Sequence, residues 1–272
     1  MPILTLTTDI GQQDYLAGAI KGQFVQAHPG CNIVDISHYL SPYNYLQAAY
    51  ICTNAFKHFP QGTFHFIIVN MFDAPGGTML LAMHDHQYIA CPDNGILTMI
   101  TGTRPRQLVA LPLPDGSKGL LDYTKTVAAA FGRLHTGEQL ESLGTAPATI
   151  NEKYPLRSTF GADWIEGQII FIDNFENVVV NITREDFESQ RKGRRFKIVF
   201  TREVIETLSD NYSSVNEGEL LAWFNSSGFL EIAMRGGKMA GLFGLQGFSE
   251  KQHAGTAFQN KWFYQTVRIF FE

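Results

Sequence analysis

The sequence predicts an α/β domain with a mostly parallel sheet and flanking helices, followed by a small antiparallel β domain. In the first half of the chain, strand-like and helical segments alternate, which is typical of a parallel sheet covered by helices. After residue 160, short β-branched runs separated by Gly and Asn dominate, which is typical of antiparallel β structure. Between them, the stretch "GTAPATINEKYPLRS" is polar, contains two prolines and shows neither the helical nor the strand periodicity of apolar residues. We therefore expect domains at 1–150 and 160–272.

The first elements follow from periodicity and punctuation. Ile3–Thr8 is rich in Ile, Leu and Thr and predicts a strand, and a helix follows from about Asp14, with apolar residues at a spacing of four until Pro29. A second strand is predicted at Asn32–Ile36. The pair Ser41-Pro42 then predicts a helix start, because serine caps a helix and proline lacks only a donor that the first turn leaves unused.

The remaining elements of the first domain are a buried strand, a pair of strands and a helix. Thr63–Val69 is almost wholly apolar, as expected of a strand covered on both faces. The two strands after it lead into the turn "PDNG", and the helix precedes the polar stretch. In order, these segments are 63–69, 80–83, 87–91 and 121–135; in the second domain the expected strands are 166–172, 178–182, 196–201, 219–225, 229–234 and 262–271.

Composition excludes several classes of function. The 272 residues carry a formal net charge of −5 without a basic stripe, which argues against nucleic-acid binding. No apolar run approaches the roughly 18–20 residues that span a bilayer, and the first residues lack the charged segment of a signal peptide. The three cysteines, Cys31, Cys52 and Cys91, show no metal-type spacing. We expect a cytoplasmic protein with reduced thiols and without a metal or membrane partner.

Two acids surround a glycine at the end of the first strand. In "LTTDIGQQDYL", Asp9 follows the strand, Gly11 permits a turn and Asp14 precedes the helix. Loops at the carboxyl ends of parallel strands are where open α/β sheets bind their ligands. This loop is therefore the first candidate for a binding site.

Six motifs in order carry a resemblance to a known family: "LTTDIG", "VDISH", "FPQGTFHFIIV", "PDNGIL", "IDNFENVVVNI" and "NSSGFLEIA". Together they resemble the S-adenosylmethionine hydroxide adenosyltransferases, whose relatives include a fluorinase and a chlorinase that use S-adenosylmethionine. The resemblance implies substitution at the ribose 5′ carbon with methionine leaving, without a separate cofactor. It also implies a homotrimer, with the site between the N-terminal domain of one subunit and the C-terminal domain of its neighbour.

The resemblance implies ligand roles for five residues. Asp9 would accept hydrogen bonds from the ribose hydroxyls and Asp14 would take a polar group of the methionine part, while Asn177 would bind ribose or adenine and Ser226 and Ser227 the methionine carboxylate. Each has a structural alternative: an acid that caps strand-end amides, a helix N-terminal acid, an Asx turn and a hairpin turn, respectively. The residue before Asn177 is glutamate where the family has glycine, so the turn is expected to differ.

The chain departs from the family at the reacting centre. Hydroxide-transferring members use an Asp, an Arg and a His, and ungapped alignment puts Asn70, Gly77 and Gly119 at these three positions. Asn70 can hydrogen-bond a water but cannot take its proton near neutral pH. Asp73, three residues on, is a candidate displaced carboxylate. A tyrosine stands at the Asn70 position in the halogenating relatives, so halide transfer is disfavoured.

Three functions stay open on this basis. The first is a divergent enzyme that hydrolyses S-adenosylmethionine to adenosine and methionine, with Asn70 or Asp73 positioning water. The second is a protein that binds adenosine or S-adenosylmethionine without turnover, and the third is transfer to another nucleophile. The sequence "MHDHQ" with His84 and His86 is interpreted as a surface turn, and Asn94 of "PDNG" as a turn residue.

Overall fold

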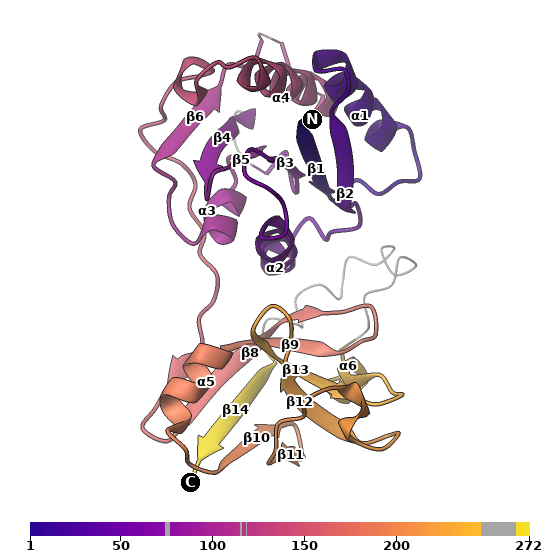
Figure 1. The fold of residues 1–272 in the computed structure, drawn as a ribbon, viewed down its shortest axis with the longest axis vertical. Helices are drawn as coiled ribbons and strands as arrows, with labels where there is room; N and C mark the ends of the chain where they lie inside the picture. Colours follow the sequence, from indigo (N-terminus) through magenta and orange to yellow (C-terminus); the bar gives the residue numbers. More distant parts are fainter. Residues whose placement is uncertain (74–76, 115, 118, 246–264) are drawn as a thin grey trace. The chain divides into compact units, whose positions relative to one another are not determined.

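The computed structural model describes residues 1–73, 77–114, 116–117, 119–245 and 265–272 (Figure 1). The chain divides into two compact units, Met1–Pro155 and Leu156–Glu272. Within the described ranges, no helix is long and apolar enough to cross a membrane. Residues 262–264 of the last predicted strand lie outside the described residues.

The first unit is built on a six-stranded sheet with the order β2-β1-β3-β5-β4-β6. Neighbours among β2, β1, β3 and β5 are parallel, whereas β4 runs antiparallel to both β5 and β6. This confirms the mostly parallel sheet, and β6 lies outside the predicted elements. The strands are β1(Ile3–Thr8), β2(Asn32–Ser37), β3(Phe64–Ile68), β4(Met79–His84), β5(Gln87–Pro92) and β6(Gln107–Leu111).

Helices cover both faces of this sheet, as the alternating pattern predicts. Helices α1(Leu16–Ala27) and α4(Leu120–His135) lie together on one face, and α2(Tyr45–Phe56) and α3(Ile96–Thr101) lie on the other (Figure 1). Side chains alternate along the strands accordingly: Phe66 packs on Phe24 of α1 with ring centroids 5.5 Å apart. The imidazole of His65 instead stacks on Phe56 of α2, at 3.6 Å.

The predicted start of one helix is wrong, and another helix begins two residues after its approximate predicted start at Asp14. Helix α2 begins at Tyr45 and is capped by Asn44, whose Oδ1 accepts from the Gln47 amide at 3.0 Å. Ser41 is not the cap, because its carbonyl accepts from the Asn44 amide in the preceding turn. Helix α1 begins at Leu16, because Asp14 Oδ1 accepts from the Leu16 amide at 2.8 Å. As a result, Tyr45 stands in the first turn of α2.

The second unit is an antiparallel sheet with the order β11-β10-β14-β8-β9-β13-β12, to which β7 adds on β8. Its core is made of buried Ile, Val and Phe side chains, among them Phe187 of α5. Helix α5 follows β9 because Thr183 caps it, accepting from the Asp186 amide at 3.0 Å. The elements are β7(Thr159–Phe160), β8(Trp164–Ile172), β9(Val178–Thr183), α5(Arg184–Arg191), β10(Phe196–Phe200), β11(Glu203–Ile205), β12(Leu220–Phe224), β13(Phe229–Met234), α6(Met239–Leu242) and β14(Thr266–Phe271). Short 3-10 helices lie at Leu140–Ser142 in the first unit and at Tyr212–Ser214 in the second.

Candidate functional site

Asp9 joins the ends of two adjacent parallel strands. Its amide donates to the Ile68 carbonyl at 3.0 Å, and its carboxylate Oδ2 accepts from the Asn70 amide at 2.7 Å. Burial raises the pKa of the carboxyl, and the Asn70 N–H partly opposes this effect by stabilising the charged form. A half-buried acceptor therefore stands at the carboxyl edge of the sheet, at the place that the sequence predicts.

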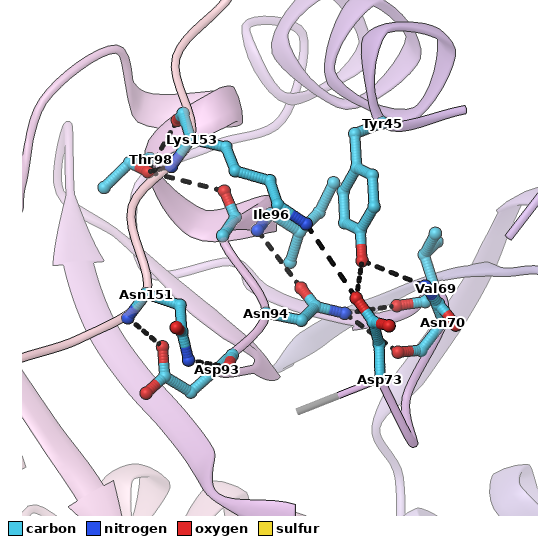
Figure 2. Close-up of polar contacts among 11 residues, drawn as sticks. Tyr45, Val69, Asn70, Asp73, Asp93, Asn94, Ile96, Thr98, Asn151 and Lys153 are labelled. Atoms are coloured by element: carbon cyan, nitrogen blue, oxygen red, sulfur yellow. Dashed lines mark hydrogen bonds and ion pairs between the residues drawn. The ribbon is translucent and has the colours of Figure 1, made fainter. Parts of the chain in front are cut away.

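Asn70 is held in a left-handed conformation directly after β3, with φ of 47°. Its carbonyl accepts from the Asn94 side chain at 3.0 Å, and its own Nδ2 donates to the Tyr45 hydroxyl at 3.2 Å (Figure 2). Asn tolerates this conformation better than most residues, but it still costs energy. The hydrogen bonds on both sides of Asn70 hold it in place.

Asn94 of "PDNG" is nearly fully buried and organises this loop. Its Nδ2 also donates to the Val69 carbonyl at 2.9 Å, and its Oδ1 accepts from the Ile96 amide at 3.1 Å. One side chain therefore connects the end of β3 with the start of α3, which Figure 2 shows.

Asp73 lies beside Tyr45 and a lysine that is distant in sequence. Tyr45 donates its hydroxyl to Asp73 Oδ2 at 3.3 Å. The Lys153 ammonium lies 3.9 Å from the same oxygen and 3.9 Å from the centroid of the Tyr45 ring (Figure 2). Mainly because of burial, the pKa of Tyr45 rises to about 12, so its hydroxyl keeps its proton at neutral pH. We call Tyr45, Asn70, Asp73 and Lys153 the Tyr45 cluster.

Gly77 and Gly119, which stand where the family pattern has Arg and His, have different surroundings. Gly77 has φ of 61°, and a Cβ placed there would overlap the Tyr123 hydroxyl and lie 2.7 Å from its Cζ. A side chain at this position would therefore displace Tyr123. Gly119 precedes α4 and donates its amide to Asp122 Oδ2 at 3.0 Å, and a Cβ there would meet only ordinary contact.

Other polar groups of the first unit lie at its surface. Asp14 is exposed, and its Oδ1 accepts from the Leu16 amide at the start of α1, which is a structural role at the helix N-terminus. Asp85 and His86 form the turn between β4 and β5, both at positive φ, with His84 Nε2 3.5 Å from Asp85 Oδ2. Among the described residues, no group of three His, Cys, Asp or Glu could hold a metal ion.

In the second unit, Asn177 is buried at the start of β9. Its Nδ2 donates to Asp173 Oδ2 at 2.9 Å and to the Tyr212 hydroxyl at 3.3 Å, and its amide donates to Asp173 Oδ1 at 2.8 Å. Glu176, the residue that replaces the family's glycine, adopts the left-handed φ of 63° that glycine would supply. Its carboxylate pairs with Lys238 at 2.6 Å. The turn keeps a left-handed residue despite the substitution.

Ser226 and Ser227 form the turn between β12 and β13. Ser226 is exposed and Ser227 half-buried, and the Ser227 amide donates to Asn225 Oδ1 at 3.0 Å. Asn225 Nδ2 in turn donates to Glu231 Oε2 at 3.1 Å. The serine turn is thus oriented through Asn225 by a carboxylate on β13.

Glu231 is only 5% exposed and accepts from three neutral donors. Besides Asn225, Trp223 donates its Nε1 to Glu231 Oε1 at 3.1 Å and Tyr212 donates its hydroxyl to the same oxygen. Because Tyr212 also accepts from Asn177, these side chains form one network. We call Asn177, Tyr212, Trp223, Asn225 and Glu231 the Glu231 cluster.

The structure therefore groups the predicted residues within each unit. It places Asp9, Asn70 and Asp73 together at the sheet edge of the first unit, and it links Asn177 to the turn of Ser226 and Ser227 in the second. Tyr45, Lys153 and Tyr212 belong to none of the motifs that predict the site, and Glu231 lies within "NSSGFLEIA" without a predicted role.

Comparison with known proteins decides the family. Residues 4–144 match the model of the SAM hydroxide adenosyltransferase N-terminal domain, and residues 167–251 match that of the C-terminal domain. The chain belongs to this family. An (R)-S-adenosyl-L-methionine hydrolase of Thermus thermophilus is 26% identical over 254 residues, covering 88% of this chain and 94% of the relative.

A fluorinase of Actinoplanes is also similar to this chain. It is 23% identical over 293 residues, which cover 90% of this chain and 95% of the fluorinase. Among solved structures, an uncharacterized conserved protein of Thermotoga maritima shares the fold, with a TM-score of 0.79 at 21% identity and coverage of 98% and 99%. Both domains expected from the resemblance are therefore present in one chain.

Proposed function

We propose that this chain binds S-adenosylmethionine and substitutes water at the ribose 5′ carbon, which yields adenosine and methionine. The C5′–O bond forms as the C5′–S bond breaks, and the electron pair of the broken bond leaves with sulfur. No further cofactor is needed, because the sulfonium is already a cationic leaving group. The protein contributes alignment of the water and exclusion of other solvent.

The position of Asp9 is the observation that carries this proposal. A carboxylate fixed by the Asn70 amide at the carboxyl end of β1 offers a rigid acceptor for two neighbouring hydroxyls, which suits a ribose diol. In the same proposal, Asp14 faces the methionine part, Asn177 the nucleoside, and Ser226 and Ser227 the methionine carboxylate. The hydrolase relatives support water as the nucleophile.

Asn70 and Asp73 are proposed to position that water. Asn70 contributes polar groups at a fixed place beside Asp9, and Asp73 contributes a carboxylate that Asn70 itself cannot supply. The carboxylate accepts a hydrogen bond from Tyr45 and can take a proton from water.

We also propose a cytoplasmic homotrimer whose site forms between the first unit of one subunit and the second unit of its neighbour. The predicted ligand residues fall on both units, which supports a composite site. All three cysteines carry free thiols, as expected in a reducing compartment. Light scattering after size-exclusion chromatography tests the trimer, and a monomer at micromolar concentration would contradict it.

The test of the reaction is a long incubation with S-adenosylmethionine, with and without chloride, read by chromatography and mass spectrometry. We expect adenosine and methionine from the natural chain and at least about a hundredfold less from Asp9→Asn, which keeps the shape but lacks the charge. Asp85→Asn, in the β4–β5 turn, is the matched control and should retain full activity. A chlorinated nucleoside, or product formation indifferent to Asp9→Asn, would contradict the proposal.

A binding protein without turnover is the second candidate, and the surroundings of Gly77 favour it. The position of the family's arginine holds Gly77 here, and Tyr123 occupies the space that a side chain at this position would need. In this case calorimetry would detect S-adenosylmethionine binding that Asp9→Asn weakens, while the ligand stays intact after the long incubation.

A further inference from the structure

Lys153 reaches the Tyr45 cluster from a distant segment that is hydrogen-bonded to the "PDNG" loop. Asn151 donates its amide to Asp93 Oδ1 and its Nδ2 to the Asp93 carbonyl, both at 2.8 Å (Figure 2). The hydroxyl of Thr98, which is fully buried, accepts from the Lys153 amide at 2.9 Å and donates to the Lys153 carbonyl at 2.7 Å. The backbone of Lys153 is therefore fixed although its side chain is partly exposed.

The path of the Lys153 side chain depends on Gly95. This glycine has φ of 96°, and a Cβ built on it would lie 2.6 Å from Lys153 Cγ and 2.7 Å from Cδ. The aliphatic stem thus occupies the space that any other residue at position 95 would fill. It directs the ammonium toward the ring of Tyr45 and the carboxylate of Asp73, each at 3.9 Å.

The Lys153 ammonium lies beside two groups that attract a cation, the face of the Tyr45 ring and the Asp73 carboxylate. Asp73 accepts from the Tyr45 hydroxyl, and the negative charges of Asp73 and Asp9 both oppose ionisation of Tyr45. The Asp73 side chain is 50% exposed, so hydrogen bonding to Tyr45 alone would leave it mobile in solvent. A lysine over the tyrosine ring attracts the ring face and the carboxylate together and keeps them adjacent.

We propose that Lys153 is a positioning residue that holds Asp73 against Tyr45, and that the attacking water loses its proton through this pair. As the C5′–O bond forms, one water proton passes to Tyr45 Oη, and the tyrosine proton passes to Asp73 Oδ2. Tyrosine stays neutral throughout, in agreement with its protonated state at neutral pH, and Asp73 later releases the proton to solvent. This inference rests on the proposed hydrolysis and adds the route through Tyr45 by which the proton reaches Asp73, together with the residue that holds this route in place.

The test compares Lys153→Met, which keeps the stem and loses the charge, with Lys153→Arg, which keeps the charge. We expect kcat for S-adenosylmethionine hydrolysis to fall about tenfold to a hundredfold in Lys153→Met, with KM changed by less than about twofold, and to recover largely in Lys153→Arg. Tyr45→Phe should lower kcat similarly. The double variant should be no worse than the lower single variant, because both act on one proton transfer.

Lys57→Met, which removes an exposed lysine at the end of α2, is the matched control and should leave kcat unchanged. If Lys153→Met keeps the natural kcat, or if its loss comes with an equal rise in KM and is not rescued by arginine, the role of Lys153 is wrong while the hydrolysis stands. If the natural chain forms no adenosine, the hydrolysis and the role of Lys153 are both wrong.

Discussion

The Tyr45 cluster of the first unit and the Glu231 cluster of the second unit use similar side chains in different environments. Each combines a tyrosine, an asparagine and a carboxylate. In the Tyr45 cluster, the side chains of Asp73 and Lys153 are 50% and 43% exposed, and a cation faces the carboxylate. In the Glu231 cluster, the carboxylate is 5% exposed and accepts from Tyr212, Trp223 and Asn225, which are all neutral donors.

The difference in burial indicates that the Glu231 carboxylate is a rigid structural support, whereas the Tyr45 cluster is accessible for a reaction. A buried carboxylate needs its hydrogen bonds, because each donor or acceptor left unpaired in the interior costs about 1–3 kcal/mol. A half-exposed carboxylate can exchange protons with water and loses little if one contact opens. We therefore expect substitution of the buried Glu231 to act mainly on stability, and substitutions in the Tyr45 cluster to act mainly on turnover.

The largest effect on stability is expected from Glu231→Ala. Removal of the carboxylate leaves three donors without their acceptor, and we expect the free energy of unfolding of the second unit to fall by about 3 kcal/mol. Urea denaturation followed by tryptophan fluorescence measures the change. Glu206→Ala, at a carboxylate that is 63% exposed in the same unit, is the control and should change stability by less than about 0.5 kcal/mol. Equal effects of the two variants would remove the distinction between the clusters.

A smaller effect is expected from Gly95→Ala in the first unit. The left-handed backbone costs alanine about 1–2 kcal/mol, and the new Cβ displaces the Lys153 stem. Thermal unfolding should show the loss of stability, and turnover should fall as in Lys153→Met. Gly137→Ala, at a φ of 98° with nothing within 4 Å, isolates the backbone strain and should leave turnover unchanged. If both variants lose turnover equally, the path of the Lys153 side chain does not matter.

Asn44→Ala tests the support of Tyr45 by its own helix. Loss of the cap at the Gln47 amide should lower stability by about 1 kcal/mol, as measured by chemical denaturation. Since Tyr45 begins α2, we also expect a modest loss of turnover. Asn44→Asp keeps the capping oxygen and should preserve stability; a loss in this variant equal to that in Asn44→Ala would show that capping is not the reason.

The smallest expected change has the opposite sign and concerns Asp9. Because the folded-state pKa of Asp9 is raised, the folded chain binds more protons than the unfolded chain just above the ordinary pKa of aspartate. Stability therefore falls as pH rises through that window, and the charge of Asp9 is a cost at neutral pH. Asp9→Asn should be slightly more stable than the natural chain at pH 7, and the difference should vanish as pH falls through the same window. Denaturation curves at several pH values test this, and a variant that is less stable at pH 7 would contradict it.

Local sequence patterns were sufficient for most of the fold and for placing Asp9 at the carboxyl edge of the first sheet. Asp9 is predictable because a strand, an acid and a glycine turn are neighbours in sequence, and parallel strands share their carboxyl ends. The prediction of Ser41 as the helix cap was wrong because Asn44, three positions later, has a similar capping preference. Only the hydrogen bond from the Gln47 amide to Asn44 shows which of the two residues caps the helix. Strand β6 (Gln107–Leu111) was not predicted; it is the edge strand of the sheet, and it forms through pairing with β4, a segment that is distant in sequence.

By itself, the sequence determined the order of the elements, the change from parallel to antiparallel structure and the family, because periodicity and contiguous motifs depend on near neighbours. The tertiary structure decided which side chains lie in contact. Lys153 reaches Tyr45 because the Thr98 hydroxyl holds the Lys153 backbone and because Gly95 leaves space for the Lys153 stem. The tertiary structure also decided that Glu231, one acid in an otherwise apolar strand, is the common acceptor of three side chains. Such meetings depend on burial and on contacts between segments far apart in the chain, and no local pattern encodes them.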